Sequence, residues 1–256
     1  DIAAMGGLPY EAFLAISAPA EFDANVIERI AGGIQASGAR FGVQIAGGDT
    51  TSTRGPLVLS LTLIGACARD EVVYRSGARP GDSIYVTGTL GNSAAGLLLA
   101  RDSKGFDSAH RTQLLRRHNR PEPRVSVGRE LASKRIATSM IDVSDGLAAD
   151  LTHVAVASGG LGVVIEEDRL PLSAEALELR TRKQLIPIAL GGGDDYELCF
   201  CVQPEYRGEI ERLGNQLSLP LTRIGQIDTT PGIWLAGESG VREEYRSGGH
   251  LHHWAD

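Results

Sequence analysis

The sequence predicts a two-domain protein of the α/β (α+β) class with mixed sheets. Segments with helical periodicity alternate with short apolar runs of strand length, and no repeat of fixed period is present. A polar, turn-rich stretch at residues 69–82 separates two sets of such segments. A chain of 256 residues, 42% hydrophobic and 22% charged, is long enough for two modest globular domains. We therefore expect an N-terminal α/β domain over residues 1–68 and a C-terminal α/β domain over residues 69–256.

The N-terminal part is expected to hold one helix and two extended runs. The helix is predicted over residues 23–35, with Asp23 as a candidate cap, because four apolar side chains recur on one face: Val26, Ile27, Ile30 and Ile34. An apolar run at residues 41–46 leads into a turn-like Gly-Gly-Asp-Thr stretch at residues 47–50. The run at residues 57–66 has strand length and carries leucine at alternate positions.

The C-terminal part alternates strands and helices. Strands are expected over residues 83–87, 136–141, 162–165 and 196–202. Helices are expected over residues 94–101, 125–132, 150–157 and 174–185, with a basic helix between residues 102 and 124. A glycine turn at residues 88–93 joins the first strand to the first helix, and an apolar run at residues 186–190 precedes three consecutive glycines.

The charge and cysteine content exclude several classes of partner. The net charge is −7 and no block is rich in lysine or arginine, which argues against nucleic acid. No apolar run approaches the ~18 residues that a membrane-spanning helix needs. We interpret Cys67, Cys199 and Cys201 as small buried thiols of a protein in the reducing cytoplasm. An acidic protein can bind a polyanion only where metal ions, backbone N–H groups or placed arginines offset the repulsion.

Three apolar runs end in the same kind of sequence, in which small residues are followed by carboxylates. The carboxylates are Asp49, Asp142, Asp145, Asp194 and Asp195. Glycine lets backbone approach a ligand closely, and carboxylates at strand ends supply hard oxygen ligands that suit Mg²⁺. Three such endings together indicate a site for metal ions and phosphate. In the structural alternative, Asp142 or Asp145 would only cap the helix that follows them.

Other phosphate-binding and catalytic signatures are missing. The sequence has no G-x-x-x-x-G-K-[ST] loop, no protein-kinase motifs and no G-x-S-x-G elbow, and the spacing of Gly88, Gly91 and Gly96 does not fit G-x-G-x-x-G. The turn at residues 88–93 could offer helix N-terminal N–H groups to a phosphate. Tight packing between strand and helix is the favoured interpretation of its glycines.

Six stretches of the sequence resemble the thiamine-monophosphate kinase family, and they occur in the family's order. They are D-I-A-A-M-G at 1–6, I-A-G-G-D-T-T at 45–51, R-S-G-A-R-P-G-D-S-I-Y-V-T-G-T-L-G at 75–91, R-P-E-P-R at 120–124, I-D-V-S-D-G-L-A-A-D-L at 141–151 and G-G-G-D-D-Y-E-L at 191–198. The family shares its fold superfamily with aminoimidazole ribonucleotide synthetase and selenophosphate synthetase. The stretches R-S-G-A-R-P-G-D and I-D-V-S-D-G-L-A-A-D-L distinguish it from these relatives.

The resemblance implies an ATP-dependent phosphotransferase. The family transfers the γ-phosphoryl group of ATP directly to thiamine monophosphate, giving thiamine diphosphate, with several Mg²⁺ ions and no phosphoenzyme. Because donor and acceptor are both anions, the protein's work is positioning and charge neutralisation, and no catalytic acid, base or nucleophile is assigned. The resemblance also implies a homodimer formed across the sheet of the N-terminal domain, which would carry part of the nucleotide and metal site.

The family's functional positions can be matched to residues of this chain. The resemblance implies ATP contacts at Gly48, Asp49, Arg75 and Ser144, metal ligands at Asp1, Asp49, Asp142 and Asp145, and a thiamine monophosphate contact at Asp194.

Two departures from the family pattern leave alternatives open. The family's upstream G-D-D-A-A-like metal motif is not in this sequence, so we expect the N-terminal domain to be incomplete. The intact protein is then a kinase and the chain by itself is impaired or inactive; in the alternative, the molecule has the motif in residues that this sequence does not include. The C-terminal text G-G-H-L-H-H-W at residues 248–254 differs from the usual G-Y-x-H-F, so no aromatic substrate contact is assigned. The alternatives are a nucleotide-binding module without turnover and another ATP-using enzyme of the same superfamily.

Overall fold

The computed structural model describes residues 1–101, 109–237 and 240–246, and these residues form two compact units. The smaller unit consists of Ile2 and Gly7–Asp70, and the larger unit of Asp1, Ala3–Gly6 and the chain from Glu71 onward. The first residues join the larger unit because the short 3-10 helix η1 (Ala3–Met5) buries Ala4 in its core. Residues 1 and 3–6, which we expected in the N-terminal domain of residues 1–68, therefore belong to the larger unit.

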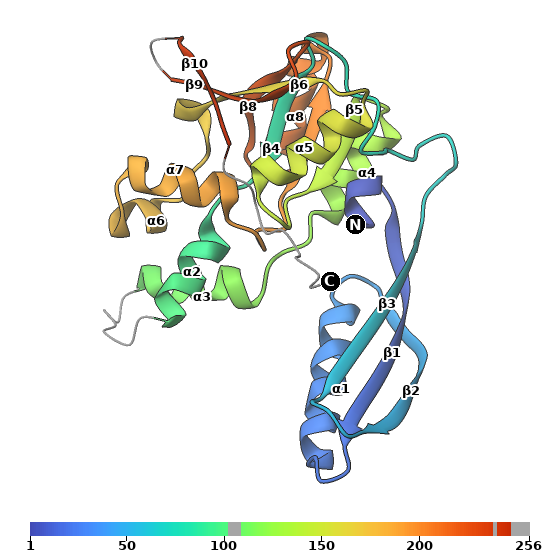
Figure 1. Ribbon diagram of the computed structural model, residues 1–256. Helices are drawn as coiled ribbons and strands as arrows, with labels where there is room; N and C mark the ends of the chain where they lie inside the picture. The colour runs from blue at the N-terminus through green and yellow to red at the C-terminus, as the bar shows by residue number, and fades with distance from the viewer. Residues whose placement is uncertain (102–108, 238–239, 247–256) are drawn as a thin grey trace. The chain divides into compact units, whose positions relative to one another are not determined.

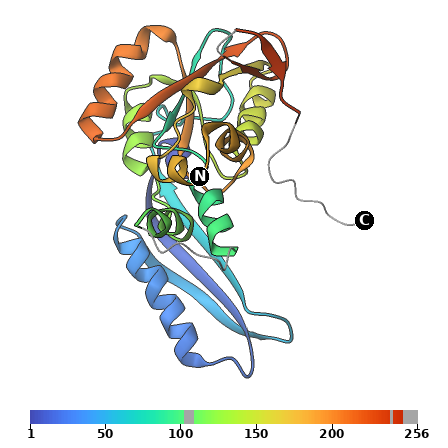
Figure 2. The same ribbon diagram turned by 90° about the vertical axis from the view of Figure 1, so that its left-hand side faces the viewer.

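The smaller unit is a three-stranded sheet with one helix (Figures 1 and 2). Its strand order is β2-β1-β3, formed by β1 (Leu8–Pro19), β2 (Gln44–Thr53) and β3 (Val58–Ala66). Strand β1 pairs in parallel with β2 and antiparallel with β3. Helix α1 (Ala24–Ala39) follows its N-cap Asp23, whose carboxylate accepts from Asn25 N at 2.9 Å. The four expected apolar residues of α1 are half-buried, which confirms the predicted apolar face of this helix.

The prediction of a turn at residues 47–50 is wrong, because these residues lie inside strand β2. Gly48 is paired with Leu14 of β1, and a Cβ atom on Gly48 would lie 1.8 Å from the Leu14 carbonyl oxygen. Glycine is required here by the close approach of the two strands. Consecutive partners on β2 skip Ala46, which marks a β-bulge just before this contact.

The larger unit is built on a seven-stranded mixed sheet with strand order β10-β9-β6-β8-β4-β7-β5. Its strands are β4 (Ser83–Thr87), β5 (Ala137–Asp142), β6 (Gly162–Glu166), β7 (Leu198–Val202), β8 (Leu221–Asp228), β9 (Gly232–Ala236) and β10 (Arg242–Glu244). Only β6 and β9 pair in parallel among the described strands of this sheet. The mixed sheet confirms the predicted fold class.

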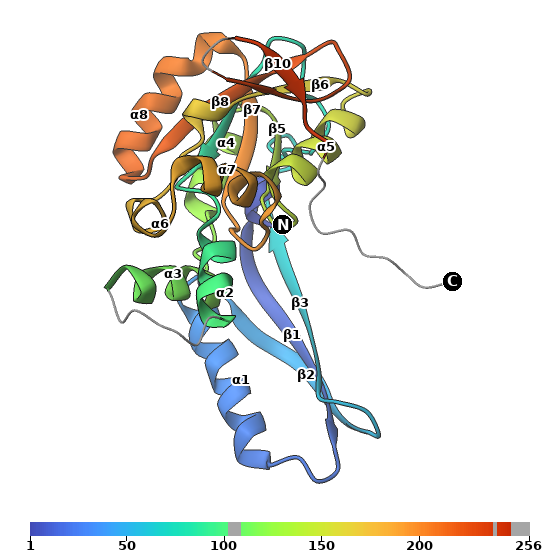
Figure 3. The same ribbon diagram turned by 60° about the vertical axis from the view of Figure 1, so that its left-hand side comes forward.

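Helices cover both faces of this sheet. They are α2 (Asn92–Arg101), α3 (Ala109–Asn119), α4 (Val125–Ser133), α5 (Leu147–Ala157), α6 (Ala174–Leu179), α7 (Arg182–Gly191) and α8 (Arg207–Leu217), with short 3-10 helices η2 (Glu167–Arg169) and η3 (Pro204–Tyr206). Figure 3 shows α5 and α8 on opposite sides of the sheet. Strand β7 is buried on both faces: Cys199 and Cys201 pack with the α5 side, and Phe200 packs with the α4 and α8 side. This placement confirms the expected burial of Cys199 and Cys201.

The single helix expected at residues 174–185 is two helices, and the apolar run at 186–190 is helical rather than extended. Thr181 and Gln184 form a capping box that starts α7 three residues after α6 ends. A short apolar run has no period that separates a strand from a buried helix. Within the described ranges, no helix combines the length and apolarity needed to cross a membrane.

Candidate functional site

Two turns of the larger unit meet at one end of its sheet. The first turn, residues 142–146, connects β5 to α5, and the second, residues 191–197, connects α7 to β7. Three backbone hydrogen bonds join them: Val143 N to Glu197 O at 2.8 Å, Asp194 N to Ser144 O at 2.9 Å and Tyr196 N to Val143 O at 2.9 Å. A Cβ atom on Gly193 would lie 2.3 Å from the Ser144 carbonyl oxygen, so only glycine permits this contact. The two carboxylate-rich segments are thereby brought together.

Asp150 of α5 supports the first turn from behind. Its carboxylate accepts from Ser144 N at 3.0 Å and from Asp145 N at 3.2 Å. Burial raises the pKa of Asp150 to about 7, although these two backbone N–H groups lower it. The N-cap of α5 is Gly146, without a side-chain cap. The capping alternative for Asp142 and Asp145 is therefore not what the structure has. Both residues are partly buried, and the Asp142 side chain is 16% exposed.

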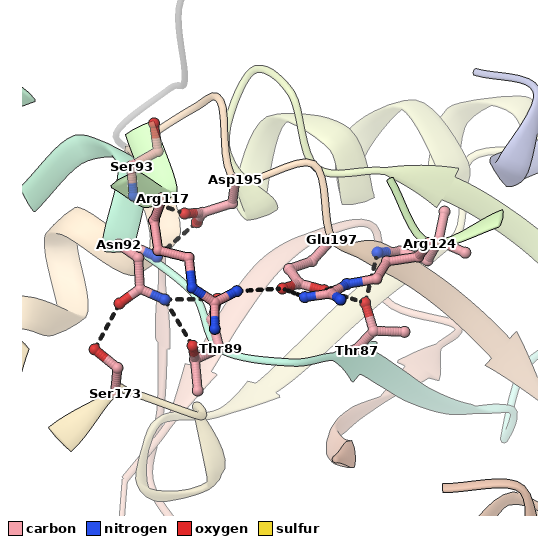
Figure 4. A network of polar contacts seen from close by, with 11 residues as sticks. Thr87, Thr89, Asn92, Ser93, Arg117, Arg124, Ser173, Asp195 and Glu197 are labelled. Atoms are coloured by element: carbon pink, nitrogen blue, oxygen red, sulfur yellow. Dashed lines mark hydrogen bonds and ion pairs between the residues drawn. The ribbon is translucent and has the colours of Figure 1, made fainter. Parts of the chain in front are cut away.

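Asp195 ties the second turn to the start of α2. Its carboxylate accepts from Gly91 N at 2.5 Å and from Ser93 N at 3.1 Å (Figure 4). Burial raises the pKa of Asp195 to about 7, against the lowering effect of these N–H groups. Because Asp195 occupies these two amides, the glycine turn at residues 88–93 serves packing, and these amides do not offer a phosphate site.

Asp194 and Tyr196 flank this anchored residue and are both exposed. Both have positive φ, 63° and 51° respectively, and the Tyr196 hydroxyl donates to Asp194 Oδ1 at 3.0 Å. The pKa of Tyr196 is raised by burial, then by its hydrogen bond to Asp194, and further by the charges of Asp194, Asp142 and Asp145. The carboxylates of both turns therefore act on one phenol.

A buried ion pair lies beneath the second turn. Arg124 binds Glu197 with two hydrogen bonds, from Nε to Oε2 and from Nη2 to Oε1, each at 2.6 Å (Figure 4). Thr87 Oγ1 donates to Glu197 Oε2 at 2.5 Å and accepts from Leu198 N at 2.9 Å. The side chains of Arg124 and Glu197 are only 13% and 3% exposed. The pair joins the R-P-E-P-R stretch to the end of the second turn.

The remaining predicted site residues are divided between the units. Asp1 lies beside the first turn, with its backbone nitrogen 3.5 Å from Asp142 Oδ1. Arg75 is exposed and lies next to β5, because the carbonyl of the preceding residue, Tyr74, accepts from Met140 N of that strand at 3.0 Å. Gly48 and Asp49 belong to β2 of the smaller unit, where Asp49 Oδ1 accepts from Thr50 N at 2.8 Å. Residues 248–254 lie outside the described residues.

The donor set of the first turn is compatible with Mg²⁺. Asp142 and Asp145 provide hard carboxylate oxygens, and within the described part of the chain no Arg or Lys side chain forms an ion pair with either. No three His, Cys, Asp or Glu side chains among the described residues form a complete protein cage for a metal. Magnesium is commonly bound by one or two carboxylates together with water and substrate phosphates, and the residues present suit that mode.

Comparison with known proteins gives a consistent result. Family models for the AIR synthase related protein match residues 1–67 (N-terminal domain) and residues 79–235 (C-terminal domain). The thiamine-monophosphate kinase of Salmonella typhimurium is 41% identical over 231 residues, which cover 89% of this chain and 68% of the relative.

Solved structures agree with the sequence relatives. The thiamine-monophosphate kinase of Stenotrophomonas maltophilia K279a superposes with a TM-score of 0.85 at 40% identity, covering 93% of this chain and 75% of that chain. AaThiL complexed with AMPPCP and TMP superposes with a TM-score of 0.83 at 31% identity, covering 97% of this chain and 75% of that chain. The fold, the two joined turns and the sequence identity lead to one assignment: the chain belongs to the thiamine-monophosphate kinase family, within the AIR synthase-like fold.

Proposed function

We propose that this protein is a thiamine-phosphate kinase, which transfers the γ-phosphoryl group of ATP to the phosphate of thiamine monophosphate and yields thiamine diphosphate and ADP. The transfer is direct and in line, without a phosphoenzyme. Family membership supports this function, as does the similarity to AaThiL, which was solved with AMPPCP and TMP.

The observation that carries the proposal is the junction of the two turns. Three backbone hydrogen bonds from Val143 and Ser144 join the turn that carries Asp142, Ser144 and Asp145 to the turn that carries Asp194. We assign Ser144 to ATP and Asp194 to thiamine monophosphate. The junction would then hold the donor side and the acceptor side of the reaction in a fixed relation, which is the main requirement for transfer between two bound substrates.

The chain's own residues orient the substrates and offset their charge. We assign Arg75 to a phosphate of ATP, since its guanidinium carries a fixed positive charge and several donors. Gly48 and Asp49 on β2 are also assigned to ATP, following the family pattern. Asp194 orients the acceptor by accepting a hydrogen bond from it. No side chain is given the role of acid, base or nucleophile, because the acceptor phosphate is already a nucleophile.

Several Mg²⁺ ions are part of the proposal. Asp1, Asp49, Asp142 and Asp145 would hold them. Bound there, Mg²⁺ would supply charge neutralisation to phosphate oxygens that otherwise repel each other. The close support of the first turn by Asp150 keeps its backbone in place while its carboxylates stay available.

We further propose that the protein is a homodimer and acts in the cytoplasm. Large apolar side chains of the smaller unit are exposed: Leu8, Tyr10 and Phe13 on β1, and Val58, Leu59, Leu61 and Leu63 on β3, at 38–51%. Exposed apolar surface of this kind is typical of a protein interface, and a second copy of the chain would cover it. The free thiols of Cys199 and Cys201 suit a reducing compartment. Nucleic acid and membrane are not among the proposed partners.

The test is a direct assay of the reaction. The purified full-length protein is incubated with ATP, MgCl₂ and thiamine monophosphate, and thiamine diphosphate and ADP are separated by chromatography. Formation of both products in equal amounts supports the proposal. If no thiamine diphosphate forms while a substrate of another superfamily member is phosphorylated, the assignment is wrong.

A further inference from the structure

The stretch Asp194-Asp195-Tyr196 has an unusual backbone. Asp194 and Tyr196 both lie in the left-handed region, which is uncommon for residues other than glycine. Such conformations persist only where the surroundings impose them, and they are concentrated at functional sites. Here each residue is held separately: Asp194 and Tyr196 by their backbone N–H groups and Asp195 by its carboxylate. The Asp195 side chain is therefore held by the protein, and the side chains of Asp194 and Tyr196 on either side of it are exposed.

The two outward side chains form a pair. The Tyr196 hydroxyl donates to Asp194 Oδ1, and no donor among the described residues bonds to Oδ2 of that carboxylate, which remains an acceptor. Tyr196 is 38% exposed, so its ring lies at the surface beside the carboxylates of the first turn. Burial, the hydrogen bond to Asp194 and the charges of the neighbouring carboxylates all raise the pKa of Tyr196, so the phenol keeps the proton that it donates to Asp194.

From this geometry we infer that Tyr196 is a positioning residue for thiamine monophosphate, because it orients the Asp194 carboxylate so that one oxygen accepts from an amino or cationic group of the substrate. The inference rests on the proposed function and adds to it a residue that acts through Asp194.

The experiment compares Tyr196→Phe with the unaltered protein. Removal of the hydroxyl takes a hydrogen bond from a charged group, and we expect the KM for thiamine monophosphate to rise about tenfold. The KM for ATP and the melting temperature should stay unchanged. Tyr206→Phe is the matched control, because Tyr206 is a half-buried tyrosine at the start of α8, and it should leave all three quantities unchanged. An unchanged KM for thiamine monophosphate in Tyr196→Phe would overturn the inference.

A double variant tests whether Tyr196 acts through Asp194. If it does, Tyr196→Phe combined with Asp194→Asn is no worse than Asp194→Asn alone. Independent, multiplying effects of the two changes would mean that the phenol contacts the substrate directly, and the positioning role would be wrong.

A binding measurement separates this inference from the proposed function. Calorimetry with thiamine monophosphate and AMPPCP in MgCl₂ reads affinity whether or not transfer occurs. Binding that Tyr196→Phe weakens about tenfold, in a protein without turnover, would reject the kinase function and keep the role of Tyr196. Normal turnover, with equal affinity for thiamine monophosphate in Tyr196→Phe and the unaltered protein, would support the kinase function and reject the role of Tyr196. Absence of binding would reject the kinase function and the role of Tyr196 together.

Discussion

Removal of Arg124 should destabilise the larger unit strongly. In Arg124→Met, Glu197 stays in the core with its carboxylate 3% exposed, and it loses both guanidinium hydrogen bonds. Thr87 would remain as a donor, and Arg117 Nη1, at 3.9 Å and 44% exposed, could compensate only in part. Leaving one charge of a buried pair without its partner costs about 3–5 kcal/mol. We expect a loss near the lower end of that range because of Thr87 and Arg117.

A double-mutant cycle shows whether this cost comes from the buried charge. Glu197→Gln removes the charge, so the combination with Arg124→Met should cost at least about 1 kcal/mol less than the sum of the two single changes. The assay is urea denaturation followed by far-UV circular dichroism. Arg207→Met removes an ion pair with Glu211 whose side chains are 72% and 61% exposed, and it should have no measurable effect. Strict additivity, or an Arg124→Met variant as stable as this control, would refute the reasoning.

Two further predictions concern the second turn. The folded protein holds a proton on Asp195 up to a pKa of about 7, whereas the unfolded chain releases it near 3.8. The stability that protonated Asp195 contributes is therefore full below pH 3.8 and is lost as pH rises through 7. Asp195→Asn should make the fall in unfolding free energy between pH 4.5 and 6.5 less steep, by up to about 1.4 kcal/mol per pH unit. Equal slopes for the variant and the unaltered protein in urea titrations would contradict this. Gly193→Ala would place a Cβ 2.3 Å from the Ser144 carbonyl oxygen, and we expect the unfolding free energy to fall by about 1–3 kcal/mol and turnover to be reduced. The control is Gly208→Ala, whose Cβ would meet nothing within 4 Å and which should leave the melting temperature unchanged. A fully stable Gly193→Ala protein would show that the two turns are not packed as described.

The elements with clear periodicity could be predicted from the sequence. The helical stripe of α1 and the buried strands β4 and β7 lie where apolar spacing and turn residues indicate. The sequence pattern does not predict strand β1, although its alternate residues Ala12, Leu14 and Ile16 are buried and carry a period-two signal. Proline at position 9 and the mixed polarity of that stretch obscured it.

The candidate site could be predicted only in part. The pattern of apolar runs followed by carboxylates indicates Asp142, Asp145 and Asp194 as candidates. The same pattern does not distinguish carboxylates that face solvent from carboxylates that hold the turns in place. Asp150 is recognised as a support through Ser144 N and Asp145 N of the turn just before α5, and Asp195 through Gly91 N and Ser93 N, 104 and 102 positions away. The hydrogen bonds of Asp195 to a distant segment leave no mark in the local pattern. The Gly-Gly-Asp stretch of β2 predicts a turn but forms a strand, because close strand packing and a turn both select glycine.

The most direct test of the central claim measures thiamine diphosphate formation by Asp145→Asn over a range of MgCl₂ concentrations, with a thermal melt in parallel. Because Asp145 is proposed to bind Mg²⁺, its replacement should lower turnover by about 100-fold or more. The melting temperature should change little because Asp150 keeps the turn in place. A variant that melts early but retains its turnover would make Asp145 a structural residue and contradict the account.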